Sequence, residues 1–126
     1  MIFPPLLMTT GAQSMTVDAP AKINLYLEII GKRPDGFHDL RSIVTPISLA
    51  DRLTLEATDG DVVCDMTLEG LPSDSHVAGS RENLATRAAL LLKDRTGYPG
   101  GVRIHILKRI PIGGGMGGGS ADAAAT

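Results

Sequence analysis

Near its end the chain carries six glycines within a window of seven residues, in the segment PIGGGMGGGSADAAAT from Pro111 to Thr126. Glycine reaches positive φ angles at little cost, so such a run can form a flexible linker. The flanking sequence favours another role. Ser120 and the alanines after it predict a capped helix. Alternating apolar and polar residues predict a half-buried strand before the run, formed by Val102, Arg103, Ile104, His105 and Ile106.

A glycine-rich loop between a strand and a helix presents backbone N–H groups beside the positive end of a helix dipole, which favours phosphate binding. The P-loop pattern GxxxxGK[ST] fits Gly113 to Ser120 except that Gly119 stands where lysine is required. The dinucleotide pattern GxGxxG also begins at Gly113, but its acidic partner would lie beyond the end of the chain. We therefore favour a third type of loop, which takes positive charge from Lys108, Arg109 and a lysine elsewhere.

Composition narrows the class of protein. The chain has 126 residues, of which 43% are hydrophobic, and this suits a single domain whose core is aliphatic because Trp is absent. A net charge of −2 without a basic cluster argues against nucleic acid as a partner. The lone Cys64 suits a reducing cytoplasm, and its apolar neighbours predict a buried thiol. The sequence leaves the oligomeric state open.

Residues 1–16 are expected to form a disordered tail, because ordered-looking sequence starts near Val17. For the same reason, translation could begin at Met8 or Met15. The apolar run in this segment is too short for a membrane span or a signal peptide, so no membrane partner is expected. Residues 17–126 are predicted to form one domain. Its last helix barely completes two turns before Thr126, which predicts a truncated domain, inactive and poorly folded alone.

The pattern of apolar residues predicts an α+β fold, a mixed sheet with helices on one side. Strands are expected at Ile23–Ile30 and Leu40–Leu49, with turn residues between them, and then in DRLTLEAT and DVVCDMTLEG. The segment SRENLATRAALLLKDRTGYPG predicts a helix, stopped by Gly97 and Pro99. Its predicted apolar face consists of Leu84, Ala88, Leu91 and Leu92.

Two segments, PAKINLYLEIIGKRPDGFHDL from Pro20 to Leu40 and KRIPIGGGMGGGSADAAAT from Lys108 to Thr126, together carry a resemblance. They resemble the superfamily of galactokinase, homoserine kinase, mevalonate kinase and phosphomevalonate kinase, in its erythritol kinase branch. The glycine loop indicates only the superfamily, whereas PAKINLYL followed by RPDGFHDL is specific to the branch. The resemblance runs from Ala19 to Thr126 and implies the N-terminal, ATP-binding domain of such a kinase, with a fold like ribosomal protein S5 domain 2.

The resemblance implies transfer of a phosphoryl group from ATP, with Mg²⁺, to a hydroxyl of a cytidine-diphosphate-linked methylerythritol in non-mevalonate isoprenoid synthesis. By match to the family's motifs, Lys22 is the catalytic lysine, Ser120 the magnesium ligand, and Asn24, Phe37 and His38 contact the cytidine-linked substrate. The match assigns ATP binding to Asn83, Lys108, Pro111, Ile112, Gly113, Gly114, Gly115, Met116, Gly117, Gly118, Gly119, Ser120, Ala121 and Asp122.

Each assignment has a structural alternative. Lys22 could be a lysine at a strand edge whose side chain extends to solvent, Lys108 could be a solvated strand-end lysine, and Asn83 could simply cap a helix. Asn24 could be a hydrogen-bonded strand asparagine, and Phe37 could anchor its loop to the core beside a solvated His38.

Two departures from the family's pattern also matter. Ala121 replaces the second serine of the family's pair, and the family's catalytic aspartate and second domain have no counterpart before Thr126. A non-catalytic nucleotide-binding module and a dinucleotide-dependent oxidoreductase are the alternatives.

Overall fold

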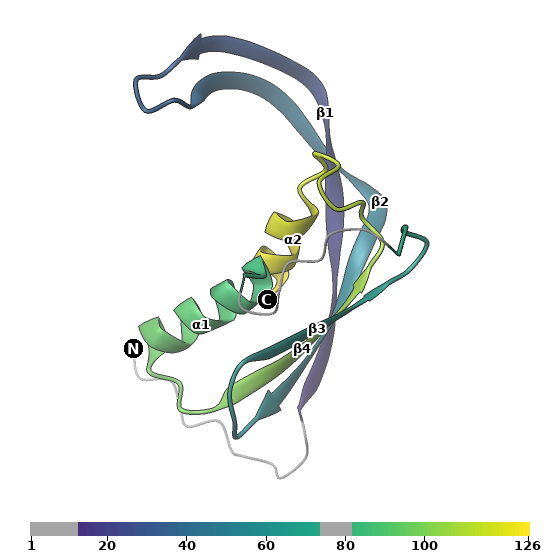
Figure 1. The fold of residues 1–126 in the computed structure, drawn as a ribbon, viewed down its shortest axis with the longest axis vertical. Helices are drawn as coiled ribbons and strands as arrows, with labels where there is room; N and C mark the ends of the chain where they lie inside the picture. Colours follow the sequence, from purple (N-terminus) through teal and green to yellow (C-terminus); the bar gives the residue numbers. More distant parts are fainter. Residues whose placement is uncertain (1–12, 74–81) are drawn as a thin grey trace.

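The computed structural model of the protein describes residues 13–73 and 82–126, and Figure 1 shows their arrangement. The four strands form one sheet in the order β1-β2-β4-β3, in which β1 and β4 both run antiparallel to β2, and β3 runs parallel to β4. Both helices lie on one side of this mixed sheet, as the sequence predicted (Figure 1). In chain order the elements are β1 (Ser14–Lys32), β2 (His38–Thr58), β3 (Val63–Leu68), α1 (Leu84–Thr96), β4 (Gly101–Lys108) and α2 (Gly118–Ala125).

The first two strands are longer than predicted. The two strands expected between Leu40 and Thr58 form one strand, β2, which continues through Pro46. Proline is tolerated there because β4 pairs only with the later part of β2, from Arg52 onward, so among the described strands the earlier part has β1 alone as its neighbour. Strand β1 begins at Ser14, so residues 14–16 of the predicted tail pair with β2, and residues 1–12 lie outside the described residues.

The far end of the β1–β2 hairpin curls over the side of the sheet that carries the helices (Figure 1). Its turn uses the predicted Asp-Gly chemistry: Asp35 Oδ1 accepts a hydrogen bond from the Phe37 N–H at 3.1 Å, and Gly36 has a φ of 88°. Most large apolar side chains on this end of the β1–β2 hairpin are exposed. Among them are Leu25, Leu27, Ile29, Ile30, Leu40 and Ile43.

Helix α1 forms where the sequence predicted it but buries a different face. Its buried residues are Ala85, Thr86 and Ala89, whereas Leu91 and Leu92 of the predicted apolar face are 57% and 59% exposed. The small side chains allow α1 to pack closely against α2 and the sheet, so the position of α2, and not the size of the side chains, selects the buried face.

The core between the helices and the sheet is aliphatic, as the composition predicted. Cys64 lies in it with 8% of its surface exposed, and burial raises the pKa of its thiol, which favours the inert protonated form. Within the described ranges, no helix is long and apolar enough to cross a membrane. The core residues are Ala19, Leu53, Cys64, Ala85, Ala89, Ile104 and Ile106.

Candidate phosphate-binding site

The glycine-rich segment forms the predicted loop between a strand and a helix, β4 and α2. Gly113, Gly115 and Gly117 have φ angles of 74°, 72° and 70°, whereas Gly114 and Met116 between them do not have positive φ. Residues other than glycine rarely adopt these φ angles, so the path of the loop depends on glycine at these three positions. Alternation between left-handed and ordinary backbone turns successive N–H groups toward one side, a geometry that binds anions.

The N-cap of helix α2 lies three residues before the predicted one. Gly117 is the N-cap, with left-handed backbone and no side-chain hydrogen bond to the helix, so the prediction that Ser120 caps the helix was wrong. Glycine takes the cap position because its φ of 70° would strain any other residue. Ser120 instead lies exposed in the first turn of α2, where its hydroxyl is not used to cap the helix.

A cavity of about 360 Å³ opens over the loop, and both helices begin at its wall. Asn83, the N-cap of α1, accepts a hydrogen bond from the Ala85 N–H at 2.8 Å, and the first turn of α2 lines the same cavity. Two helix N-termini therefore face one space, which favours an anionic ligand. The lining comprises Met66, Glu82, Asn83, Leu84, Lys108, Asp122 and Pro111 to Ser120.

Lys22 contacts the loop from β1. Its backbone N–H donates a hydrogen bond to the Met116 carbonyl at 2.9 Å. Its side chain runs along Gly117, where an added Cβ would lie 3.2 Å from Lys22 Cγ. No described residue forms an ion pair with Lys22, so its positive charge is available to a ligand at the start of α2.

The two cations directly before the loop differ from Lys22, because carboxylates balance both of them. Arg109 pairs with Glu69. Lys108 is not a solvated strand-end lysine: 4% of its surface is exposed, and its Nζ binds Asp51 as well as Asp122, the latter at 2.9 Å. The sequence predicted three cations near the loop. Lys108 and Arg109 are both paired with carboxylates, whereas Lys22 has no ion-pair partner among the described residues.

Asp122 has fewer side-chain hydrogen bonds than its buried neighbours Asp51 and Lys108. Its Oδ1 has no hydrogen-bond partner, and burial raises the pKa of its carboxyl to about 6 although Lys108 acts in the opposite direction. An unfolded aspartate releases its proton near its ordinary value of 3.8. The carboxyl of Asp122 therefore holds its proton across a pH interval in which an unfolded chain has lost it.

We expect this difference to make stability depend on pH. The contribution of Asp122 to the free energy of unfolding is fully present below pH 3.8 and is lost as the pH rises through about 6, with a slope of at most about 1.4 kcal/mol per pH unit. Asp122→Asn should remove this slope. Urea denaturation of both forms at several pH values between 4 and 7 measures the difference, and parallel profiles would contradict the prediction.

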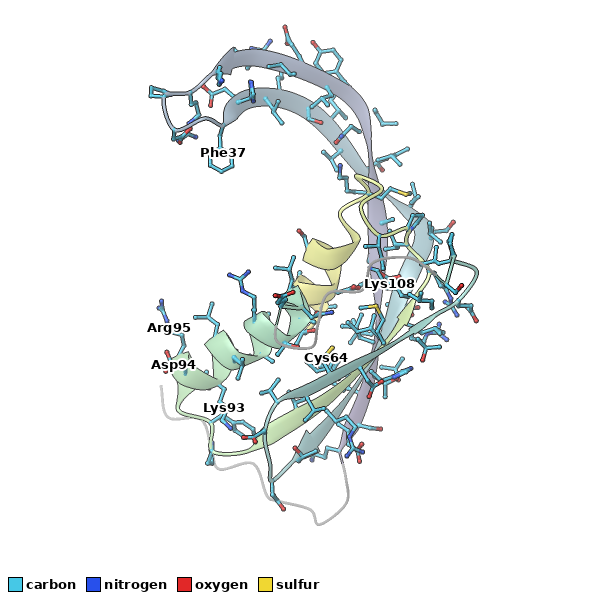
Figure 2. The ribbon with its side chains drawn as sticks, in the orientation of Figure 1. Phe37, Cys64, Lys93, Asp94, Arg95 and Lys108 are labelled. Carbon is cyan, nitrogen blue, oxygen red and sulfur yellow. The ribbon has the colours of Figure 1, made fainter. Side chains whose placement is uncertain are left out.

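The other predicted site residues lie on the hairpin. Asn24 Oδ1 accepts a hydrogen bond from Ser42 Oγ at 3.2 Å on the exposed ribbon. Phe37 is 71% exposed, so it does not anchor its loop to the core, and His38 beside it is also exposed. Figure 2 shows the Phe37 ring pointing from the hairpin tip toward the side of the sheet that carries the helices. None of the three lines the cavity.

Comparison with known proteins agrees with this arrangement. Residues 83–126 match the family described as "GHMP kinases N terminal domain". A solved structure of 4-(cytidine 5'-diphospho)-2C-methyl-D-erythritol kinase superposes with a TM-score of 0.63 at 47% identity and covers 87% of this chain. Homoserine kinase from Cytophaga hutchinsonii superposes with a TM-score of 0.61 over 95% of this chain, but at 18% identity it shows the fold alone.

Together these findings indicate the class of protein: residues 83–126 match the N-terminal domain of the GHMP kinases, and the fold of the described chain is similar to that of two solved small-molecule kinases. The chain is similar to 4-diphosphocytidyl-2-C-methyl-D-erythritol kinases, with 47% identity to the protein of Synechococcus sp. strain CC9605 and 44% to that of Symbiobacterium thermophilum. These matches cover 88% and 87% of this chain. The chain spans 35% and 37% of the length of these two relatives.

Proposed function

We propose that the full-length protein is a small-molecule kinase that transfers the γ-phosphoryl group of ATP to a hydroxyl of 4-diphosphocytidyl-2-C-methyl-D-erythritol. The hydroxyl oxygen bonds to the γ-phosphorus, the bond from phosphorus to the β–γ bridging oxygen breaks, and ADP leaves as the hydroxyl proton is released. The observation that carries the proposal is the loop with left-handed glycines at the start of α2, beside Lys22, which has no ion-pair partner among the described residues. The printed names of the relatives support the choice of substrate.

In this proposal the loop and the first turn of α2 bind the phosphates of ATP, because they line the cavity at which both helices begin and the N-terminus of a helix favours anions. Lys22 stabilises the charge that develops on the migrating phosphoryl group. Asn83 would contact the adenosine portion while it caps α1, since it both accepts the Ala85 hydrogen bond and lines the cavity.

Mg²⁺ would accompany the nucleotide, where it offsets phosphate charge. No group of three or more potential metal ligands occurs among the residues described. This fits an ion that keeps several waters and binds mainly to substrate phosphates. Ser120, exposed in the first turn of α2, is the residue that would hold it. Asp122 is a poor candidate because Lys108 and the interior already enclose its carboxylate.

The test is phosphoryl transfer by the purified full-length protein from γ-labelled ATP to the cytidine-linked methylerythritol. We expect label in the sugar-alcohol product and release of ADP. ATP binding without transfer would instead favour a non-catalytic nucleotide-binding module. The dinucleotide-dependent oxidoreductase receives no support from the family match or the named relatives. A cytoplasmic location, which suits the lone Cys64, is part of the same proposal.

The hairpin tip gives this proposal a prediction about the base. Because Phe37 is exposed, Phe37→Ala should leave folding unchanged but weaken binding of the cytidine-linked substrate by about 1–3 kcal/mol, the range of stacking between a base and an aromatic ring. ATP affinity should not change. Calorimetry with each ligand measures both effects, and Tyr98→Ala, at another exposed aromatic residue, is the matched control.

A companion measurement addresses recognition of the base edge. If groups at Phe37 and His38 hydrogen-bond the cytosine, a uridine-linked analogue should be used far less well, because its unmatched polar groups leave donors or acceptors unpaired. Comparison of kcat/KM for the two substrates, in the wild type and in His38→Ala, decides this. Equal use of both bases by the wild type would remove the hairpin from base recognition.

A further inference from the structure

One buried charged residue next to the loop has no role in the function described above. Asp51 of β2 is fully buried, yet its carboxylate is directed at the segment that leads into the loop. Its Oδ1 accepts hydrogen bonds from the backbone N–H groups of Arg109 at 2.6 Å and Ile110 at 2.8 Å. Its Oδ2 binds Lys108 Nζ. The residues that it holds are the last of β4 and the first two after it.

The same carboxylate also reaches the other end of the loop, through Lys108. Lys108 Nζ donates a second hydrogen bond to Asp122 Oδ2 of α2 at 2.9 Å. The first turn of α2 packs on this lysine, because an added Cβ on Gly118 would lie 2.8 Å from Nζ. Figure 2 shows Lys108 where the end of β4 meets α2. One buried carboxylate thus connects the strand before the loop to the helix after it.

We propose that Asp51 is a positioning residue for phosphate binding. It holds the end of β4 and the start of α2 at a fixed separation, so that the loop between them keeps its N–H groups directed into the cavity. The inference rests on the proposed binding of nucleotide phosphates at this loop. Preorganised donors bind a charged group well because they need no rearrangement when the ligand arrives.

Without this carboxylate the connection fails at both ends. The N–H groups of Arg109 and Ile110 would lose a charged acceptor, and Lys108 would keep Asp122 as its single partner. A buried group that loses its partner costs free energy, so the loop ends would shift to find other partners or water. A substitution at Asp51 leaves the sequence of the loop unchanged, so its effect on ATP binding reports the position of the loop alone.

Asp51→Asn is the informative variant, because asparagine keeps the shape and one acceptor but removes the charge that binds Lys108. In the full-length protein we expect Kd and KM for ATP to rise about tenfold or more, whereas kcat at saturating ATP and the affinity for the cytidine-linked substrate stay within about twofold. Ile104→Val, in the core of the same sheet, is the control, since it lowers stability without contacting the loop.

Amide hydrogen exchange gives a readout that needs no ligand. The Lys22 N–H donates to the Met116 carbonyl and the Ala121 N–H donates to the Gly117 carbonyl, so these two amides report whether the loop stays in place. Both should exchange faster in Asp51→Asn than in Ile104→Val when the two variants are compared at equal stability. If the wild type binds no ATP, the proposed function fails, while this measurement still tests the anchoring by Asp51.

Asp51→Glu provides a second variant should Asp51→Asn not fold. It keeps the negative charge for Lys108 but is one methylene longer, so it can retain its hydrogen bonds only if the ends of the loop move apart. Weaker ATP binding and faster exchange at Lys22 and Ala121 are again expected. The inference is overturned if the folded Asp51 variants bind ATP as well as Ile104→Val and protect the two amides equally.

Discussion

Replacement of Lys22 by methionine is expected to lower kcat of the full-length enzyme by roughly two orders of magnitude or more, with little change in ATP affinity. The side chain lies along Gly117 at the start of α2 and has no ion-pair partner among the described residues, so its charge is free to meet the migrating phosphoryl group. Charge on that group is redistributed during the proposed reaction, and for this reason we expect the lysine to act on the transition state more than on bound ATP.

Methionine keeps most of the aliphatic stem that packs on the loop, so the variant removes the charge with little loss of packing. Lys32→Met, at the far end of the same strand, is the matched control and should leave kcat unchanged. Steady-state kinetics and calorimetry with ATP together separate the two effects. Near-normal turnover by Lys22→Met would exclude Lys22 from the mechanism.

The second large effect is expected at Gly117. Gly117→Val should weaken ATP binding well beyond tenfold, or about 1.4 kcal/mol, for two reasons. Valine is strained at a φ of 70°, and its Cβ would lie 3.2 Å from Lys22 Cγ, so the lysine or the loop must move. Both responses disturb the region where the phosphates are proposed to bind.

Gly70→Val separates strain from position. Gly70 has a φ of 69°, almost the same as Gly117, but a Cβ added there would meet nothing within 4 Å. The two variants therefore carry a similar backbone cost at different places. Gly70→Val should lower stability and leave ATP affinity unchanged, and calorimetry on both completes the comparison. Unchanged affinity in Gly117→Val would exclude the loop as the phosphate site.

The sequence predicts the fold class and the glycine loop well because both depend on local patterns. Apolar alternation in β4 places Ile104 and Ile106 in the core, and the glycines that follow leave little choice but a loop. The buried face of α1 was predicted wrongly, because the prediction placed the large side chains of Leu91 and Leu92 on it. In the structure Ala85 and Ala89 are buried instead, since their small side chains permit close packing. Only the position of α2 decides between the two faces.

Asp51 was missed although a signal was present. In the segment SLADRLTLEAT it occupies a position that alternates with Leu53, so it belongs to the inward face of its strand, where an acid requires a partner. The identity of that partner could not be predicted, because Lys108 is remote in sequence. Lys22 and Gly117, which are in contact, are even further apart in sequence, and the family resemblance, not the local pattern, brought Lys22 into the predicted site.

The strand order has a consequence for synthesis on the ribosome. Within the described ranges, β3 pairs with β4 alone, and β4 also borders β2, so β4 enters between two strands that are made before it. When β3 leaves the ribosome, its partner has not yet been translated, and the β1–β2 hairpin is the one paired unit available. The inward faces of Leu53 and Cys64 then lack their cover. Unpaired strand edges and exposed apolar faces invite wrong association, so the nascent chain should be most dependent on chaperones until β4 emerges.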